Sequence, residues 1–315
     1  MIRAAVTGGS MPVAGEIIKL LINHPDIELS WVLEPRAEGA LVSQLHKGLR
    51  GETYMRFSAK PDMENIDVLF LCYEEPGEGI RFLEQYPVPD RVKLLDVSGD
   101  MLPRSTFADG DEWIFGLPEL SRKPLVRGGV RASLPPALTS AVLLALMPLA
   151  KEHALSCGDI HVNAVVAEEN AEPGETLALI DIEEADDIVR ALRSLQPDFA
   201  TPMTFVVMCG GWRRGISVAI HFKSPMSEEK AVELYNDYYS DHSFTFISSS
   251  MPNLNEVAGT NKCIINVQRV GDRLVINAVI DDLIKGSAAM AVHDMNLLFG
   301  LQERVGLMLK SHACS

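Results

Sequence analysis

Short apolar runs alternate with helical patterns through the first hundred residues, and this alternation constrains the fold more than any other feature of the sequence. Parallel strands covered by helices on both faces read as continuous apolar runs, and "DVLFLC" and "VKLLDV" fit that description. Strands that alternate with helices in this way predict a parallel, doubly wound sheet. Ligands of such sheets bind beyond the carboxyl ends of the strands. The apolar runs are residues 2–7, 28–33, 67–71 and 93–97, and the helical patterns are 14–23 and 77–85.

The pattern changes after an apolar helical run at residues 139–151. Longer strand-like segments follow, and two of them flank Gly271-Asp272, a pair suited to a hairpin turn. With 315 residues and 47% hydrophobic content, the chain is long enough for two domains. We therefore expect an α/β domain of nucleotide-binding type at 1–135, completed by the helical segment 288–315, and an α+β domain at 136–287. The later strand-like segments are 159–166, 203–208, 216–222, 263–270 and 273–280.

The charge and cysteine content exclude several function classes. A net charge of -15, with no basic stripe to offset it, predicts that the chain does not bind nucleic acid. No apolar run approaches the about 20 residues that span a bilayer, so we expect no membrane association. The five cysteines form no CxxC pair and the histidines form no close ligand pair, so neither a disulfide framework nor a metal site is predicted. These observations favour a reduced, cytoplasmic protein.

The first predicted strand ends in "TGGSMPVAGE", where a nucleotide-binding fold places a glycine-rich turn against a helix. Gly8 and Gly9 fit that turn. A dinucleotide site needs a further glycine for close approach of the pyrophosphate, whereas Met11 fills that space and Pro12 lacks an N–H donor. Two interpretations therefore stay open, a cofactor cradle and a purely structural turn.

Polar residues follow two other predicted strands. Glu34 is placed to accept ribose hydroxyls and Arg36 to pair with an NADP 2′-phosphate, but the two also suit a solvated loop. Ser98 and Asp100 are either site residues or turn formers. Neither pair identifies a cofactor by itself.

Residues 261–300 read "NKCIINVQRVGDRLVINAVIDDLIKGSAAMAVHDMNLLFG", two strands followed by an Asp-Leu-x-Lys-Gly motif and a Met-Asn helix. This segment resembles the closing segment of N-acetyl-gamma-glutamyl-phosphate reductases, which make a semialdehyde in arginine biosynthesis. The resemblance implies a Rossmann-like sheet plus an α+β semialdehyde-dehydrogenase-type dimerisation domain, with NADP as cofactor. Further segments match in chain order at 16–29, 41–53, 115–122, 143–151 and 213–216.

The resemblance also locates the family's chemistry, and the reactive residues are missing there. A family cysteine in an Asn-Pro-Gly-Cys turn attacks the acyl phosphate, NADPH reduces the resulting thioester, and a histidine assists proton transfer. That turn falls on residues 133–136, so the cysteine position is Pro136, which has no group able to form a thioester. The family's two histidine positions are Ile182 and Glu184. No catalytic residue is therefore assigned.

Ligand-contact positions have changed as well. Glu168 and Glu169 stand in the substrate loop, where each close like-charge pair with an acyl phosphate costs roughly 4 kcal/mol at a surface-like dielectric. Met290 replaces the glutamine of the family's cofactor motif. The matching positions that keep a candidate role are Gly8, Gly9, Ser98, Lys285 and Gly286 for the cofactor and Arg214 for a substrate carboxylate. A surface ion pair is an equal alternative for Arg214.

The leading hypothesis is a catalytically inactive relative that acts as a binding or regulatory protein. The resemblance implies a homodimer or homotetramer, or a hetero-oligomer with an active paralogue. One alternative is an oxidoreductase with altered chemistry that uses Cys72 or the Glu168–Glu169 pair. Another is a metabolite sensor that binds a nucleotide or a small acyl-amino acid without turnover.

Overall fold

A computed structural model describes residues 1–103, 113–156, 158–167, 176–177 and 182–311 of the chain. It divides into two compact units. Unit 1 comprises Met1–Pro135 and Ser287–Met308, and unit 2 comprises Pro136–Gly286 together with the residues from Leu309 on. The chain therefore leaves unit 1 after Pro135, returns to it at Ser287 and leaves it again after Met308.

Unit 1 contains a seven-stranded sheet in the order β3-β2-β1-β4-β5-β7-β6. All of its strand pairs are parallel, which confirms the predicted doubly wound sheet. The order reverses between β1 and β4, and the carboxyl ends of strands at such a switch point form a binding crevice. The strands are β1 (Ile2–Thr7), β2 (Ile27–Leu33), β3 (Phe57–Ser58), β4 (Val68–Leu71), β5 (Lys93–Asp96), β6 (Ile114–Phe115) and β7 (Arg131–Ser133).

The helices of unit 1 bury apolar faces on this sheet. Helix α1 (Pro12–Leu21) begins with a proline at its first position, where the missing N–H would have no helical partner. Helix α9 (Ala289–Leu298) is buried along its whole length and packs on α1, on β5 and on α4 (Pro118–Val126). The remaining helices are α2 (Val42–Leu45) and α3 (Glu78–Gln85).

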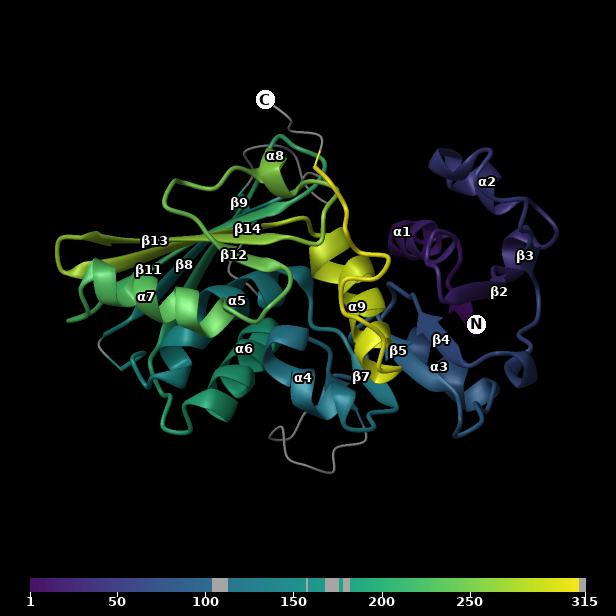
Figure 1. Ribbon diagram of the computed structural model, residues 1–315, viewed down its shortest axis with the longest axis horizontal. Helices are drawn as coiled ribbons and strands as arrows, with labels where there is room; N and C mark the ends of the chain where they lie inside the picture. Colours follow the sequence, from purple (N-terminus) through teal and green to yellow (C-terminus); the bar gives the residue numbers. More distant parts are fainter. Residues whose placement is uncertain (104–112, 157, 168–175, 178–181, 312–315) are drawn as a thin grey trace. The chain divides into compact units, whose positions relative to one another are not determined.

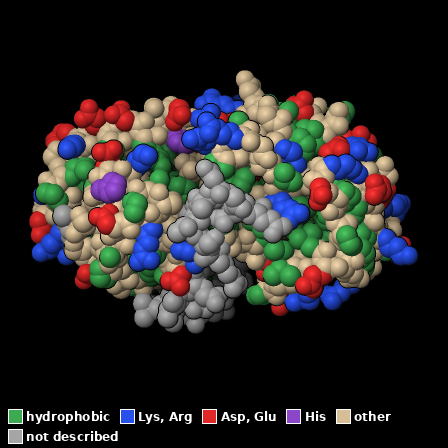
Figure 2. Space-filling view, turned by 90° about the horizontal axis from the view of Figure 1, so that it is seen from below, with side chains coloured by type: hydrophobic (Ala, Val, Ile, Leu, Met, Phe, Trp, Pro, Cys, Tyr) green, Lys and Arg blue, Asp and Glu red, His purple; other side chains and the backbone are tan. Residues whose placement is uncertain are grey.

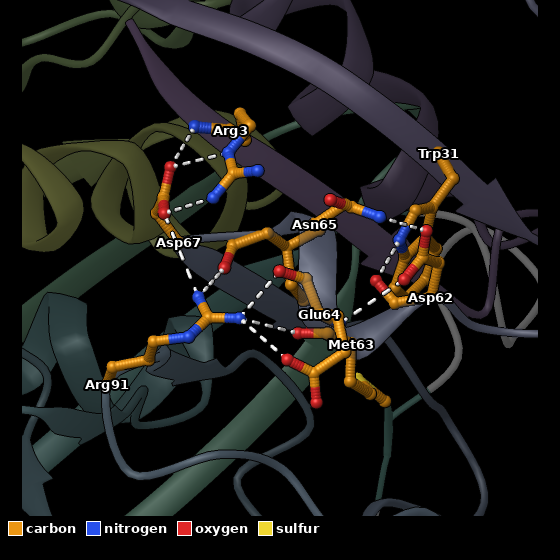
Figure 3. Close-up of polar contacts among 9 residues, drawn as sticks. Arg3, Trp31, Asp62, Met63, Glu64, Asn65, Asp67 and Arg91 are labelled. Carbon is orange, nitrogen blue, oxygen red and sulfur yellow. Dashed lines mark hydrogen bonds and ion pairs between the residues drawn. The ribbon is translucent and has the colours of Figure 1, made fainter.

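A charged network fastens the amino-terminal edge of this sheet (Figure 3). Asp67 accepts hydrogen bonds from the backbone amide of Arg3 at 2.8 Å and from its guanidinium at 2.9 Å. Arg91 donates to the carbonyls of Ile66 and Glu64, each at 2.6 Å. These contacts join the entry of β4 to β1 and leave the opposite edge for the site.

Unit 2 contains a mixed sheet in the order β12-β13-β14-β11-β8-β10-β9. The Gly271-Asp272 hairpin is confirmed, because Val270 pairs with Arg273. Two short strands, β9 (Thr176–Leu177) and β12 (Thr245–Ile247), were not predicted. The others are β8 (Ile160–Val166), β10 (Met203–Cys209), β11 (Ile216–Lys223), β13 (Cys263–Val270) and β14 (Arg273–Ile280).

Helices cover one face of the unit 2 sheet, namely α5 (Ala137–Lys151), α6 (Ile182–Leu195) and α7 (Glu228–Tyr239) (Figure 1). Strand residues alternate accordingly, because Val218, Ile220 and Phe222 are fully buried toward the helices, whereas their neighbours are only half-buried. The short helix α8 (Leu254–Val257) precedes β13. Among the described helices of unit 2, only this short α8, which contacts β14, is drawn on the other side of the sheet (Figure 1).

Two further features of the described residues are the distribution of surface charge and the lengths of the helices. Acidic and basic side chains are interspersed on the face drawn in Figure 2. No helix in the described part of the chain is long and apolar enough to cross a membrane.

Candidate functional site

The switch point of unit 1 opens into a cavity of about 650 Å³ at the carboxyl ends of β1, β2 and β4. Four carboxylates line it, those of Glu34, Glu74, Glu75 and Glu78, against the single cation of Arg36. This excess of negative charge makes the cavity a poor environment for phosphate groups, which are also negatively charged.

Gly8 and Gly9 both have structural reasons to be glycine. Gly8 has a φ of +61°, and a Cβ there would lie 1.7 Å from the carbonyl oxygen of Cys72 on the neighbouring strand's end. A Cβ on Gly9 would lie 2.6 Å from Cγ1 of Val32. The close approach of β1 to β4 and β2 therefore accounts for both glycines without a ligand.

The donors that follow these glycines are already engaged. The amide of Ser10 donates to Oε2 of Glu34 at 3.2 Å, and the amide of Met11 donates to the carbonyl of Gly8 at 2.9 Å. Pro12 has no N–H, and Met11 precedes α1 without a side-chain cap. Since a pyrophosphate binds to free amides at such a turn, residues 10–12, which offer it no free amide, do not fit one.

Asp96, at the end of β5, is fully buried. Its Oδ2 accepts from the Ser133 hydroxyl at 2.6 Å and from the Met101 amide at 2.8 Å, and its Oδ1 accepts from both the amide and the hydroxyl of Ser98. Burial raises the pKa of Asp96, and the hydrogen bonds from Ser133 and Ser98 oppose that effect. Asp96 was not predicted as a candidate site residue, although an acidic residue at the end of the apolar run "VKLLD" indicated a polar group at the carboxyl end of a strand.

The loop after β5 therefore serves the fold. The Ser98 hydroxyl, predicted to contact a cofactor, is engaged with Asp96. Asp100 accepts from the amides of Gly77 at 2.7 Å and Gly79 at 3.0 Å and so caps the start of α3. Of the two interpretations left open for Ser98 and Asp100, these contacts favour the structural one.

In unit 2, the family's nucleophile position and its Lys-Gly motif lie together. Pro136 is the residue before α5, and it is followed by Ala137. A Cβ on Gly286 would lie 2.5 Å from the Cβ of Ala137, so Gly286 is required by this packing. Lys285 is fully buried beside it in the chain, in the π-helical turn Ile284–Ala288. The structure thus brings together residues far apart in sequence.

Arg214, predicted to bind a substrate carboxylate, is paired with a carboxylate of the chain itself. Its Nη2 lies 3.3 Å from Oδ1 of Asp281, which is fully buried. The same carboxylate accepts from the amides of Gly259 at 2.7 Å and Ile284 at 2.8 Å. Burial raises the pKa of Asp281, and the charge of Arg214 opposes that effect. The pair holds the start of the Lys-Gly turn.

Among the alternative reactive groups, the described cysteines are not accessible. Cys72, Cys209 and Cys263 are buried, and burial raises the pKa of the Cys72 thiol, so it does not form a thiolate at neutral pH. Ile182 and Glu184 fall in the first turn of α6. The Glu168–Glu169 pair lies outside the described residues.

Met290, at the family's glutamine position, is fully buried in α9 and belongs to the core of unit 1. In the described part of the chain, no group of three or more His, Cys, Asp or Glu residues is arranged to hold a metal ion.

Known proteins match this chain along its whole length. Residues 3–127 match the family model for the semialdehyde dehydrogenase NAD binding domain, and residues 183–282 match that for the semialdehyde dehydrogenase dimerisation domain. N-acetyl-gamma-glutamyl-phosphate reductases from Parabacteroides distasonis and Bacteroides thetaiotaomicron are each 36% identical over 99% of this chain and 100% of their own length. The chain belongs to the N-acetyl-gamma-glutamyl-phosphate reductase family.

Solved structures of other proteins share this fold. Aspartate semialdehyde dehydrogenase II from Vibrio cholerae has a TM-score of 0.68 at 16% identity and covers 95% of this chain and 99% of that one. A probable aspartate-semialdehyde dehydrogenase from Pseudomonas aeruginosa has a TM-score of 0.67 at 14% identity, covering 95% and 98%. At these identities the likeness concerns the fold, a nucleotide-binding type unit plus a mixed-sheet unit.

Proposed function

We propose that this chain is a non-catalytic member of its family that acts as a binding or regulatory protein. The observation that carries the proposal is Pro136, which stands directly before α5 where the family carries its nucleophilic cysteine. Reduction of an acyl phosphate through a thioester needs a thiolate as nucleophile and leaving group, and a proline ring supplies neither. Cys72 offers no substitute because it is buried as a neutral thiol, which also argues against altered chemistry at that residue.

The cofactor side supports the same proposal. NADP carries phosphates, and the cavity of unit 1 presents four carboxylates and one guanidinium to them. The internal contact between Glu34 and Ser10 uses an amide that a pyrophosphate would need. Each unscreened carboxylate–phosphate pair at about 4 Å adds roughly 4 kcal/mol of repulsion at a surface-like dielectric. We infer that NADP(H) is bound weakly or not at all.

The test compares this chain with the Parabacteroides distasonis relative. Both are assayed for NADP(H)-coupled turnover of N-acetylglutamate semialdehyde, and intact-mass spectrometry searches for the covalent thioester. We expect neither turnover nor thioester from this chain. A variant of the relative with its nucleophilic cysteine changed to proline sets the background rate. Turnover by this chain at a rate near that of the unmodified relative would contradict the proposal.

A second candidate is a metabolite sensor, because a cavity of about 650 Å³ persists at the switch point. Calorimetric titration with NADPH, NADH and N-acetylglutamate discriminates between the two. Saturable binding of one of these without turnover favours the sensor, and absence of binding leaves a role toward a protein partner.

We also propose a cytoplasmic homodimer or homotetramer, or a hetero-oligomer with an active paralogue. The match of residues 183–282 to a dimerisation domain and the sheet face of unit 2 that α5, α6 and α7 leave uncovered support assembly. Light scattering on the purified chain, alone and mixed with an active family member, tests this. A monomer under both conditions overturns it.

A further inference from the structure

Strand β13 extends well past its edge neighbour β12 in unit 2. The two strands pair from Thr245 opposite Cys263 to Ile247 opposite Ile265, whereas β13 continues to Val270. The edge of β13 beyond Ile265 borders a cavity of about 790 Å³, lined by the end of β12, by β13 and by one side of α7. A segment of unpaired strand edge therefore faces an open cavity.

The backbone of Val267 is directed into this opening. Val270 pairs with Arg273 across the hairpin turn, and hydrogen-bonded pairs alternate along an antiparallel ladder. Odd-numbered residues of β13 therefore direct their N–H and C=O groups away from β14. Two contacts agree, because Ile265 accepts from the amide of Ser248 at 2.7 Å and the amide of Cys263 donates to Phe244 at 2.8 Å.

Side chains close both ends of the unpaired edge. At one end, the amide of Arg269 donates to the Glu228 carboxylate at 2.7 Å. At the other end, Asn266 donates through Nδ2 to the carbonyl of Ser248 at 3.0 Å. Val267 lies between Asn266 and Arg269. A short extended segment beside Val267 would leave both of these hydrogen bonds in place.

Asn266 also carries an unsatisfied acceptor. The residue is only 2% exposed and lines the cavity, and its Oδ1 has no hydrogen-bond partner among the described residues. A buried acceptor without a donor is energetically costly, so such groups mark positions where a hydrogen-bond partner is missing.

The wall formed by α7 is acidic with one apolar position. Glu229 and Glu233 are exposed on this wall, and Val232 lies between them in sequence. The guanidinium of Arg269 is held by the carbonyls of Ser224 and Met226, so it is directed to the chain's own backbone. The cavity lining therefore carries three carboxylates, with Glu228 as the third, against one guanidinium, and a ligand in it meets net negative charge.

We propose that this cavity is a docking slot for an extended peptide segment of a partner protein, which adds as a strand beside Val267 and directs lysine or arginine side chains toward α7. Main-chain hydrogen bonds give affinity in this mode and the flanking side chains give specificity. From Ile265 to Arg269, the edge accepts a segment of about four residues at about 3.3 Å each. The slot is separate from the reductase-like residues, so it does not depend on the loss of catalysis.

The probe is an acetylated, amidated five-residue peptide of alternating lysine and valine, and the control is its glutamate–valine counterpart. Amide exchange of Val267, followed by NMR, reports strand addition directly. In the free protein this amide exchanges faster than that of Ile276 in the paired centre of β14, and the lysine–valine probe slows it about tenfold at millimolar concentration. The glutamate–valine peptide leaves it unchanged.

Two charge reversals on α7 complete the test. Glu233→Lys, on the cavity wall, weakens the lysine–valine probe by about tenfold, which is about 1.4 kcal/mol. Asp237→Lys makes the same charge change one turn further along the exposed surface and leaves probe binding unchanged. Equal effects of the two variants, equal binding of the two peptides, or unchanged Val267 exchange with the probe present would each overturn the proposal.

Discussion

The carboxylate of Glu34, at the end of β2, accepts a hydrogen bond from the backbone amide of Ser10 in the turn that follows β1, at 3.2 Å. An acidic side chain of the chain itself thus occupies a donor that nucleotide-binding folds offer to a phosphate. The turn is stabilised from within, and its capacity to bind an anion is reduced by the same contact.

Removing this contact is expected to increase NADPH affinity only when Met11 is changed as well. Met11→Gly alone clears space but leaves the Ser10 amide engaged, whereas Glu34→Ala with Met11→Gly frees both, and we expect about a tenfold gain over the single variant. NADPH fluorescence titration measures it. Met11→Gly with Glu78→Ala is the matched control, since it removes a cavity carboxylate that Ser10 does not contact. Equal gains from the two double variants would contradict the proposed role of Glu34.

The stability of unit 1 is expected to depend on the ionisation of Asp67. Hydrogen bonds from Arg3 lower the pKa of Asp67 in the folded state. A lowered folded-state pKa stabilises the fold above the unfolded value of about 3.9, and this contribution is lost as the pH falls through the folded-state pKa. The stability difference between the unmodified chain and Asp67→Asn should therefore shrink as the pH drops from 6 toward about 3 in urea unfolding. A difference that stays constant over this range would show that the ion pair contributes nothing through its charge.

Gly286→Ala is expected to destabilise unit 2 by about 1–3 kcal/mol, because the added methyl would lie 2.5 Å from the Cβ of Ala137. Thermal unfolding measures the loss. Gly48→Ala is the control, since a Cβ there meets nothing within 4 Å. Combining Gly286→Ala with Ala137→Gly should recover part of the loss, and strict additivity of the two changes would show that the residues do not interact.

Cys72 is expected to resist iodoacetamide in the native protein at neutral pH and to react readily in denaturant, because burial keeps it as a thiol. Peptide mapping by mass spectrometry assigns the modified residue, with Cys209 and Cys263 as buried controls. Selective labelling of Cys72 in the folded chain would instead support the alternative of an oxidoreductase that uses this thiol at the end of β4.

Strands β1, β2, β4 and β5 of the parallel sheet were predictable because they are apolar runs separated by helical patterns, a signal that needs no knowledge of tertiary contacts. The short strands β3, β6 and β7 were not predicted. Met11 and Pro12 likewise indicated from sequence that the turn had lost space and a donor. The contact of Glu34 with Ser10 was not predictable, since it depends on strand order bringing the end of β2 beside the end of β1.

Side-chain contacts between residues distant in sequence could not be predicted for the same reason. Arg214 was predicted to pair either with a substrate carboxylate or in a surface ion pair, and its actual partner, the buried Asp281, is 67 residues away. Asp96 was read as part of a strand, because a single acid after an apolar run does not reveal which hydroxyls will meet it. Short strands such as β12 carry too few residues for a periodic signal.

The return of the chain to unit 1 has a consequence for biosynthesis. Helix α9 packs on α1, α4 and β5, yet it is translated more than a hundred residues after the last strand of that sheet. The apolar faces that it covers remain exposed while residues 136–286 of unit 2 are synthesised. Incomplete chains that stop within unit 2 should therefore be strong clients of chaperones and prone to aggregate.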